Sequence, residues 1–165
     1  MILTQAKLKE LVWYNPDTGT LHWQYTRGTA VKDQRVGYRH TNVRNKTTYL
    51  RAEILGKKYF VHVLIWLYHT GQFPNGGLDH KDRNGMHNQF ENLREATSSQ
   101  NKFNSGLQIC NTTGAAGVTR HKSKWRAQIT KEGKKIHIGL FSSKLEAILA
   151  RAEMADKLFG EFHAR

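Results

Sequence analysis

The stretch that decides the fold spans residues 78–94 and reads LDHKDRNGMHNQFENLR. The wider segment, residues 76–104, is polar and irregular at first, and from about residue 88 its pattern favours a helix. An adjacent Asp79 and His80 would by themselves more often be a turn or a surface pair. Their setting reverses that interpretation, because one asparagine follows His80 by twelve positions and another lies nine positions further on.

This spaced pattern resembles the HNH nuclease family. More narrowly, it is similar to the variant of phage and intron homing endonucleases in which asparagine replaces the last histidine. The resemblance rests on Asp79 and His80, on Asn92 within an Asn-Leu-Arg, on Asn101, and on His62 between two apolar residues upstream. The implied fold class is α+β, with a ββα-metal (His-Me finger) nuclease core and an N-terminal β-rich region.

The resemblance also implies a role for each residue. In this family a neutral histidine on a strand deprotonates the attacking water, and one divalent ion offsets the charge that develops on the phosphate. His80 is then the general base, with Asp79 and Asn101 as oxygen ligands of one Mg²⁺ (or Mn²⁺) per active site. Asn92 takes the family's orienting role, holding the loop that carries His80 and fixing the geometry and tautomer of its ring.

Several neighbouring residues keep open interpretations. His62 is equally a structural histidine or a DNA contact. His87 is expected to be a solvated loop residue rather than a ligand. Arg83 and Arg94 either grip phosphate or belong to the solvated surface.

The N-terminal part, residues 1–75, predicts a β-rich region. Thr4 caps a short helix whose apolar face is Leu8, Leu11 and Val12, and residues 15–19 form a turn around Pro and Gly. Strands are expected at residues 20–25, 35–39, 47–54 and 57–60, followed by a helix at residues 61–69 that ends at Gly71.

A second domain follows the nuclease part. Residues 105–114 are small and turn-prone, and they predict a linker between a nuclease domain at residues 1–104 and a second domain at residues 115–165. Strands are expected at residues 117–121, 124–130 and 135–141, then a helix at residues 143–159 that begins with a capping box of Ser143 and Glu146. Alternation in the middle strand separates two faces, one with Trp125, Ala127 and Ile129 and the other with Arg126, Gln128 and Thr130.

This second domain resembles the Apetala-type domain of plant ethylene-response factors, through Gly117-Val118, residues 125–129, residues 138–141 and Glu146-Ala147. The resemblance implies a three-stranded antiparallel sheet packed on one helix, with the open sheet face in the major groove of DNA. By family position, the groove contacts are Thr119, Gln128, Thr130, Lys135 and His137, and the phosphate contacts are Arg120, Lys122, Lys124 and Arg126. The residues with which the plant proteins contact DNA bases are not matched in this sequence. The resemblance therefore does not imply the plant target sequence. A small α+β domain with an ordinary basic face is the alternative.

The net charge favours a nucleic-acid partner. The chain has 26 Lys and Arg against 13 Asp and Glu, a formal charge of +13. Lys and Arg that neutralise phosphates release counterions, which explains such an excess. An anionic membrane is the rival partner, but no basic amphipathic anchor is present. The partner is therefore expected to be double-stranded DNA, with no membrane and no small-molecule cofactor.

The remaining expectations concern compartment and assembly. One cysteine, Cys110, excludes an intramolecular disulfide and a multi-cysteine zinc site. The first residues have no long apolar run, so a cytoplasmic protein is expected, in the host cell if it is phage-encoded, and a monomer.

Together these features predict a metal-dependent DNA endonuclease of homing type, which nicks or cuts both strands by phosphodiester hydrolysis. A non-catalytic DNA-binding regulator with a decayed nuclease fold is the alternative. An RNA-directed nuclease is a third, disfavoured because a groove-reading sheet suits duplex DNA.

Overall fold

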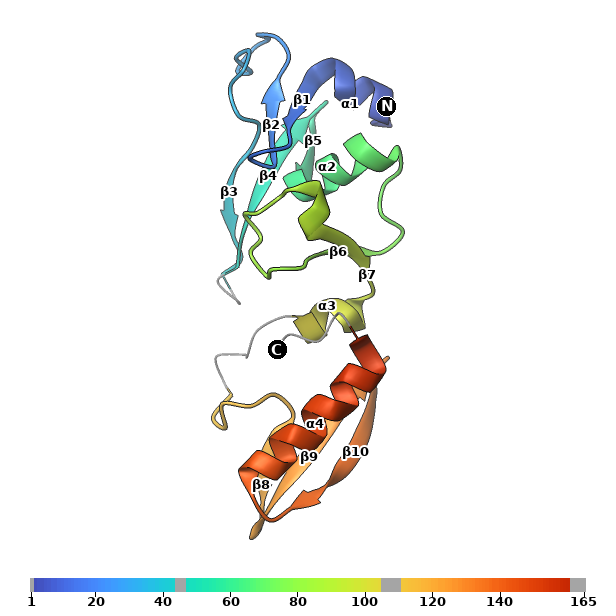
Figure 1. Cartoon of the computed structure of the whole chain (residues 1–165). Helices are drawn as coiled ribbons and strands as arrows, with labels where there is room; N and C mark the ends of the chain where they lie inside the picture. Colours follow the sequence, from blue (N-terminus) through green and yellow to red (C-terminus); the bar gives the residue numbers. More distant parts are fainter. Residues whose placement is uncertain (1, 44–46, 105–110, 161–165) are drawn as a thin grey trace. The chain divides into compact units, whose positions relative to one another are not determined.

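The chain forms two compact units, Met1–Ala96 and Thr97–Arg165. The computed structural model describes residues 2–43, 47–104 and 111–160 (Figure 1). The predicted linker begins later than the division between the units, and residues 105–110 of it, Cys110 included, lie outside the described residues. None of the described helices is long and apolar enough to cross a membrane.

The first unit opens with a helix and a hairpin. Helix α1 (Gln5–Leu11) begins where the Thr4 side chain accepts a hydrogen bond from the backbone of Lys7, as predicted. Val12, expected on the helix, instead starts strand β1 (Val12–Asn15), which pairs with β2 (Thr20–Trp23). The prediction missed β1 because the apolar pattern of the helix runs directly into the strand.

A three-stranded antiparallel sheet follows, in the order β3-β4-β5. Its strands are β3 (Tyr38–Thr41), β4 (Thr48–Ile54) and β5 (Lys57–Phe60). The strand predicted at residues 35–39 is displaced toward the C-terminus, and buried Val36 instead donates its backbone N–H to Leu21. In β4, Leu50, Ala52 and Ile54 are buried in the core, which leaves Tyr49 and Arg51 on the other face.

Helix α2 (Val61–Thr70) follows β5 and ends at Gly71, which adopts the left-handed conformation with φ 79°, as predicted. The main core of the first unit gathers side chains from α1, α2, the hairpin and the sheet. Its fully buried members include Leu8, Leu21, Ile54, Leu64, Ile65 and Leu67.

Residues 78–94, the stretch that carries the Asp-His pair, form a second hairpin rather than a helix. Strand β6 (Gly77–His80) pairs antiparallel with β7 (Leu93–Ala96), and a single 3₁₀ turn (Phe90–Asn92) precedes β7. The helix predicted from about residue 88 was therefore wrong at this place. Pairing with β6 satisfies the backbone of β7, and Leu93 is buried in the core, so tertiary contacts override the local pattern.

Helix α3 (Ser98–Asn104) comes next and belongs to the second unit. Along the chain, β6, β7 and α3 thus follow the ββα order that the resemblance implied. A metal-binding role for this segment stays a prediction.

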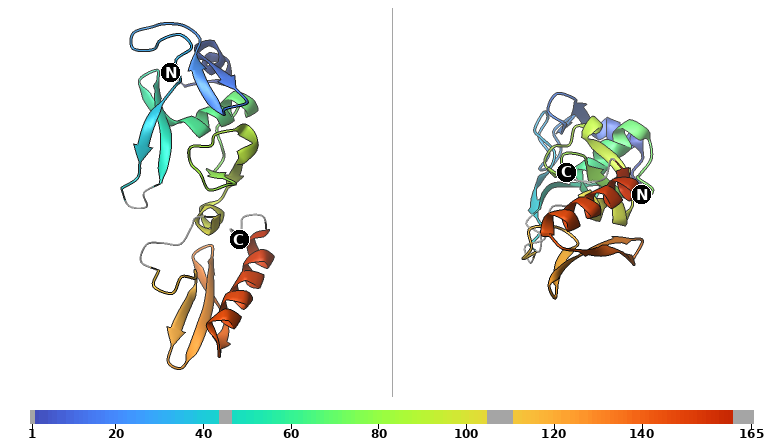
Figure 2. Two further views of the ribbon diagram at one scale, coloured as in Figure 1. Left: turned by 60° about the vertical axis from the view of Figure 1, so that its left-hand side comes forward. Right: turned by 60° about the horizontal axis from the view of Figure 1, so that its bottom comes forward.

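The rest of the second unit is an antiparallel sheet and one long helix. The strands β8 (Val118–His121), β9 (Lys124–Lys131) and β10 (Lys134–Phe141) pair in the order β10-β9-β8. Helix α4 (Lys144–Phe159) covers one face of this sheet (Figure 2), with Ser143 and Glu146 forming the predicted capping box. Val118, Ala127 and Ala147 form the buried centre between them. The expected arrangement of three strands on one helix is confirmed.

Candidate active site

The β6–β7 ladder fixes the Asp-His pair. Asp79 lies opposite Arg94, and His80 lies opposite Leu93. The side chains of successive strand residues point to opposite sides, so Asp79 and His80 serve different surroundings from one short strand. Both residues are buried, with 7% and 5% of their surface exposed.

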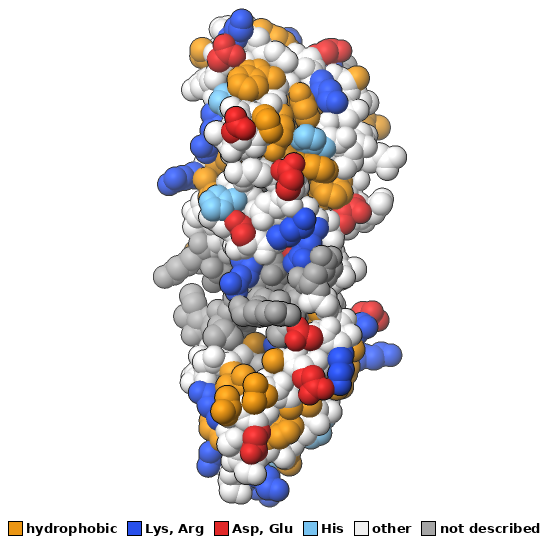
Figure 3. Space-filling view, viewed as in Figure 1, with side chains coloured by type: hydrophobic (Ala, Val, Ile, Leu, Met, Phe, Trp, Pro, Cys, Tyr) orange, Lys and Arg blue, Asp and Glu red, His pale blue; other side chains and the backbone are white. Residues whose placement is uncertain are grey.

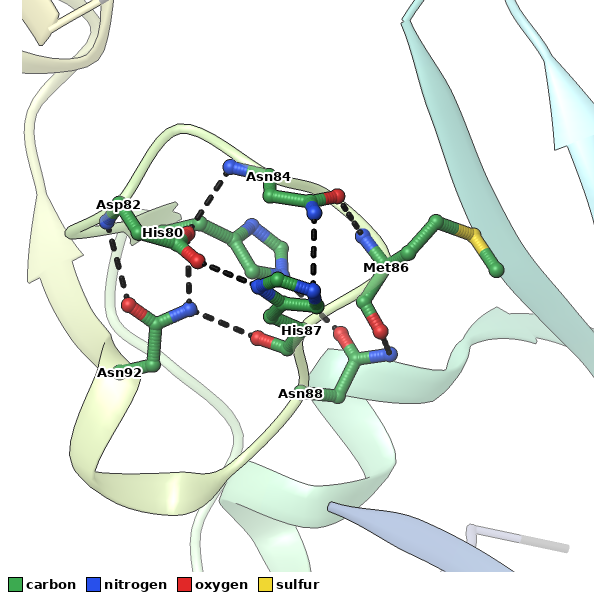
Figure 4. Close-up of polar contacts among 7 residues, drawn as sticks. All are labelled: His80, Asp82, Asn84, Met86, His87, Asn88 and Asn92. Carbon is green, nitrogen blue, oxygen red and sulfur yellow. Dashed lines mark hydrogen bonds and ion pairs between the residues drawn. The ribbon is translucent and has the colours of Figure 1, made fainter. Parts of the chain in front are cut away.

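The loop between the two strands is held by the Asp82 carboxylate (Figure 4). Its Oδ1 accepts from the backbone N–H of Asn84 at 2.9 Å and from Nδ2 of Asn92 at 2.9 Å. Its Oδ2 lies 2.7 Å from Nδ1 of His87. Burial acts to raise the pKa of Asp82, but these hydrogen bonds outweigh it and the pKa is lowered. A charged carboxylate therefore organises the loop.

His87 belongs to this network although its ring is exposed, as expected. Asn84 accepts the backbone N–H of Met86 through Oδ1, so its Nδ2 donates to Nε2 of His87 at 3.0 Å. The Nε2 atom must then carry the lone pair, and Nδ1 donates to Asp82. His87 thus links Asp82 to Asn84 within the loop.

Asn92 ties the two ends of the loop together. Its Oδ1 accepts from the backbone of Asp82 at 3.1 Å, and its Nδ2 donates to the backbone carbonyl of His87 at 2.8 Å. Its own carbonyl accepts from the backbone of Lys81. Asn92 therefore contacts the loop, as predicted, but the hydrogen bond to the His80 ring comes from a different residue.

That residue is Asn88, which the sequence did not single out. Its Oδ1 lies 3.0 Å from Nε2 of His80, and its Nδ2 points to the carbonyl of Met86 at 3.4 Å. The second contact orients the amide, so Nε2 of His80 donates the hydrogen bond and Nδ1 carries the lone pair of the neutral ring. Assigning the tautomer to Asn92 was wrong. Nothing in the sequence separates Asn88 from the other asparagines of the loop.

The N-terminal hairpin supports the segment that carries Asn88. The Tyr14 hydroxyl accepts from the backbone N–H of Phe90 at 3.0 Å. A Cβ atom on Gly19 would lie 2.7 Å from the carbonyl carbon of Asn88 and 2.4 Å from the nitrogen of Gln89. Only glycine permits this approach at φ 63°.

The surroundings of His80 keep its ring neutral. Burial lowers the pKa of His80, while the hydrogen bond with Asn88 and the carboxylates of Asp82 and Asp79 act in the opposite direction. The net effect is a pKa below the ordinary value. A neutral imidazole next to carboxylates can accept a proton and is stabilised once it has done so.

His62 lies against the same ring in a buried position, and both of its interpretations, a structural histidine and a DNA contact, stay predictions. The ring centroids of His62 and His80 are 5.0 Å apart, with an angle of 82° between the planes. His62 also stacks on Phe60 and contacts Tyr49. Burial, with a smaller contribution from His80, lowers the pKa of His62 to about 3. His62 is therefore neutral at physiological pH.

The Asp79 carboxylate is held by an arginine. Nε and Nη2 of Arg94 lie 3.0 and 2.9 Å from the same oxygen, Oδ2. Of the two interpretations of Arg94, the solvated surface is wrong, because its side chain is only 11% exposed. Arg83, by contrast, is exposed and has φ 65°.

The metal ligands predicted from the sequence lie in different units. Asp79 is on β6 of the first unit, and Asn101 is on α3 of the second. Among the described residues, no cluster of three or more His, Cys, Asp or Glu side chains is arranged to hold a metal ion. A shared ion between Asp79 and Asn101 stays a prediction.

The sheet of the second unit brings most of the predicted DNA-contacting residues onto the face that α4 leaves open. Thr119 pairs with Arg126, Gln128 with His137, and Thr130 with Lys135. By alternation Lys124 shares this face. Arg120 instead pairs with Trp125 and lies over its ring at 5.2 Å, and Lys122 occupies the β8–β9 turn.

The opposite side of the second unit has a different character. Hydrophobic side chains lie among charged ones on the α4 side (Figure 3), where Leu145 and Leu149 are 64% and 60% exposed. The open sheet face thus carries most of the polar and basic candidates.

Comparison with known proteins supports the nuclease part of the chain. Residues 59–103, which include His62, Asp79, His80 and Asn101, match the family model described as HNH endonuclease. "Protein 3.8" of Escherichia phage T7 is 34% identical over 76 residues, covering 44% of this chain and 63% of that protein. An "Uncharacterized HNH endonuclease" of Acanthamoeba polyphaga mimivirus is 31% identical over 120 residues, covering 72% of this chain and 63% of that protein.

The matched regions therefore span less than two thirds of either relative. No solved structure matches the chain. The HNH part of the resemblance is supported over residues 59–103 and indicates a nuclease, whereas the Apetala-type resemblance of the second unit stays a prediction.

Proposed function

We propose that the protein is a metal-dependent DNA endonuclease that hydrolyses phosphodiester bonds of duplex DNA, with His80 as the general base. The observation that carries this proposal is the hydrogen bond of 3.0 Å between Nε2 of His80 and Oδ1 of Asn88. It directs the lone pair to Nδ1 of a buried ring whose pKa is lowered, which is the state that a general base requires.

In the proposed reaction, the first proton transfer is to the His80 ring. Nδ1 of His80 takes a proton from water, and the water oxygen forms a bond to phosphorus. The bond from phosphorus to the 3′ oxygen breaks, leaving a 5′-phosphate and, once the leaving oxygen takes up a proton, a 3′-hydroxyl. The carboxylates of Asp82 and Asp79 favour the imidazolium that forms, while Nε2 keeps donating to Asn88.

The residues present fit a hard divalent ion such as Mg²⁺ or Mn²⁺. Asp79 offers a buried carboxylate, and Asn101 would add an amide oxygen, so the donor set contains oxygen alone. Nε and Nη2 of Arg94 both contact Oδ2 of Asp79, which fixes the orientation of the carboxylate. When bound, the ion supplies charge stabilisation at the phosphate and the leaving oxygen. Waters and the DNA phosphate would complete its coordination.

The second unit would hold and select the DNA. Its open face carries the cationic side chains of Lys124, Arg126 and Lys135 beside Gln128 and His137, a mixture suited to phosphate and base-edge contacts. This supports the Apetala-type role inferred from the sequence. In this proposal the protein acts as a monomer. Its biological role is homing, as part of a phage-borne mobile element.

Nicking of supercoiled plasmid with Mg²⁺ tests the function. The unaltered chain should nick, and chelation of the metal should stop it. His80→Ala should abolish nicking while retaining DNA binding. His137→Ala is the matched control: it should weaken binding and leave the rate at saturating protein unchanged. DNA binding without any nicking by the unaltered chain, on phage or host DNA, would instead favour a regulator with a decayed nuclease fold.

A further inference from the structure

Two buried polar atoms in the first unit have no hydrogen-bond partner in the part of the chain that the structure describes. They are Nδ1 of His62 and Nε of Arg51. His62 is almost fully enclosed, with 8% of its surface exposed. Buried polar atoms are normally hydrogen-bonded, because a buried atom without a partner has lost its bonds to water and destabilises the fold. An apolar side chain at the same place would carry no such cost. A ligand that arrives from outside would explain both atoms.

Both side chains contact the same aromatic ring, that of Phe60. The guanidinium carbon of Arg51 lies 5.2 Å from the centre of the Phe60 ring, and His62 stacks on the same ring at 5.3 Å. His62 in turn contacts His80 at 5.0 Å. Tyr49 closes the group, 5.7 Å from both Phe60 and His62. A continuous series of contacts thus leads from Arg51 to the base of the proposed reaction.

The chemistry of the pair selects an anion. Arg51 presents a permanent positive charge with donors that suit phosphate oxygens. His62 stays neutral, with a pKa of about 3, so it adds hydrogen bonding without a second charge beside His80. An acceptor-rich group of single negative charge satisfies both.

We propose that Arg51 and His62 form a phosphate subsite beside His80, which holds a phosphodiester group of the cut strand next to the scissile one. His62 contacts the His80 ring directly, whereas Arg51 is linked to it through Phe60 and His62. Along this series of contacts, Arg51 is therefore further from His80 than His62 is. That position suits a neighbouring phosphate rather than the one under attack. The inference rests on the proposed endonuclease function, because the cut strand supplies the ligand.

Single-turnover cutting with variants of the full chain tests whether Arg51 binds the DNA. Arg51→Gln should raise the half-saturating protein concentration about tenfold and lower the slope of binding against salt by about one. Arg39→Gln is the matched control, because Arg39 lies opposite Leu50 on the other face of the same sheet. It removes the same charge and should leave half-saturation within about twofold. Equal effects of the two variants would overturn the subsite.

His62 is tested through the rate at saturation. His62→Phe keeps the ring packing and removes the unpaired nitrogen, so its melting temperature should be equal or higher, while cutting slows about tenfold. His62→Asn returns a polar atom near the position of Nδ1 and should recover part of the rate. If His62→Phe cuts at the same rate as the unaltered chain, the His62 ring serves packing alone and is not part of a phosphate subsite.

Nuclear magnetic resonance without metal separates this inference from the nuclease proposal. Short duplex DNA of mixed sequence is titrated into the full chain in the presence of a chelator. The Arg51 Nε–H and His62 ring signals should shift and saturate. Shifts in a protein that never nicks would leave the subsite standing and remove the nuclease. Nicking by a protein whose Arg51 and His62 signals stay unmoved on bound DNA would do the reverse.

Discussion

Acidification should destabilise the first unit through His62. The folded state lowers the pKa of this ring from 6.5 to about 3, because burial opposes its charged form. The unfolded chain therefore binds more protons over that interval, and the stabilising contribution, fully present above 6.5, is lost as the pH falls toward 3. At about pH 5 the pH lies about 1.5 units below the unfolded pKa, so at about 1.36 kcal/mol per unit His62 costs about 2 kcal/mol.

The assay is urea unfolding near pH 7 and near pH 5, for the unaltered chain and for His62→Phe. Trp125 lies in the second unit, so a Trp125→Phe background leaves only Trp13, Trp23 and Trp66 to report by fluorescence on the first. His69 and His80 also have lowered pKa values, but they are common to both proteins and largely cancel in the comparison.

Between the two pH values, the unaltered chain should lose about 2 kcal/mol more than His62→Phe. Equal losses in the two proteins would refute the reasoning, since the ring would then carry its proton in the folded state at no cost. A larger loss in His62→Phe would contradict it as well.

Three further predictions concern the loop and the second unit. Asn88→Ala should slow cutting at saturating protein by about 10–100-fold, because the His80 tautomer loses its partner; an equal loss of DNA affinity would argue against a positioning role. Gly85→Ala should destabilise the first unit by about 1–3 kcal/mol, because its Cβ would lie 2.6 Å from the Thr48 carbonyl oxygen; urea unfolding measures this, and an unchanged midpoint would count against such close packing. Gln128→Ala should reduce the preference for the target over random DNA more than it reduces cutting at saturation, and competition binding is the measurement.

Local signals predicted much of the fold. The Thr4 and Ser143 caps, the end of α2 at Gly71 and the sheet of the second unit follow from residues close together in the chain. The exceptions are β1, which the prediction missed, β3, which is displaced from residues 35–39, and above all β7, whose sequence also suits a helix. Its strand conformation depends on pairing with β6 and on burial of Leu93. Such contacts join residues on either side of a long loop and leave no local pattern.

The sequence by itself determined the Asp79-His80 pair and the polar face of β9, because these depend on adjacency and alternation, and its resemblance to a known family implied the loop-holding role of Asn92. The tertiary structure alone decided that Asn88 meets His80. The loop's asparagines are chemically alike, and the one that reaches the ring is set by packing. Tyr14 holds the neighbouring Phe90 from 76 positions away, and Gly19 lets the hairpin approach Asn88. Contacts between distant segments place a buried amide against an imidazole, and that placement decides which ring nitrogen carries the lone pair.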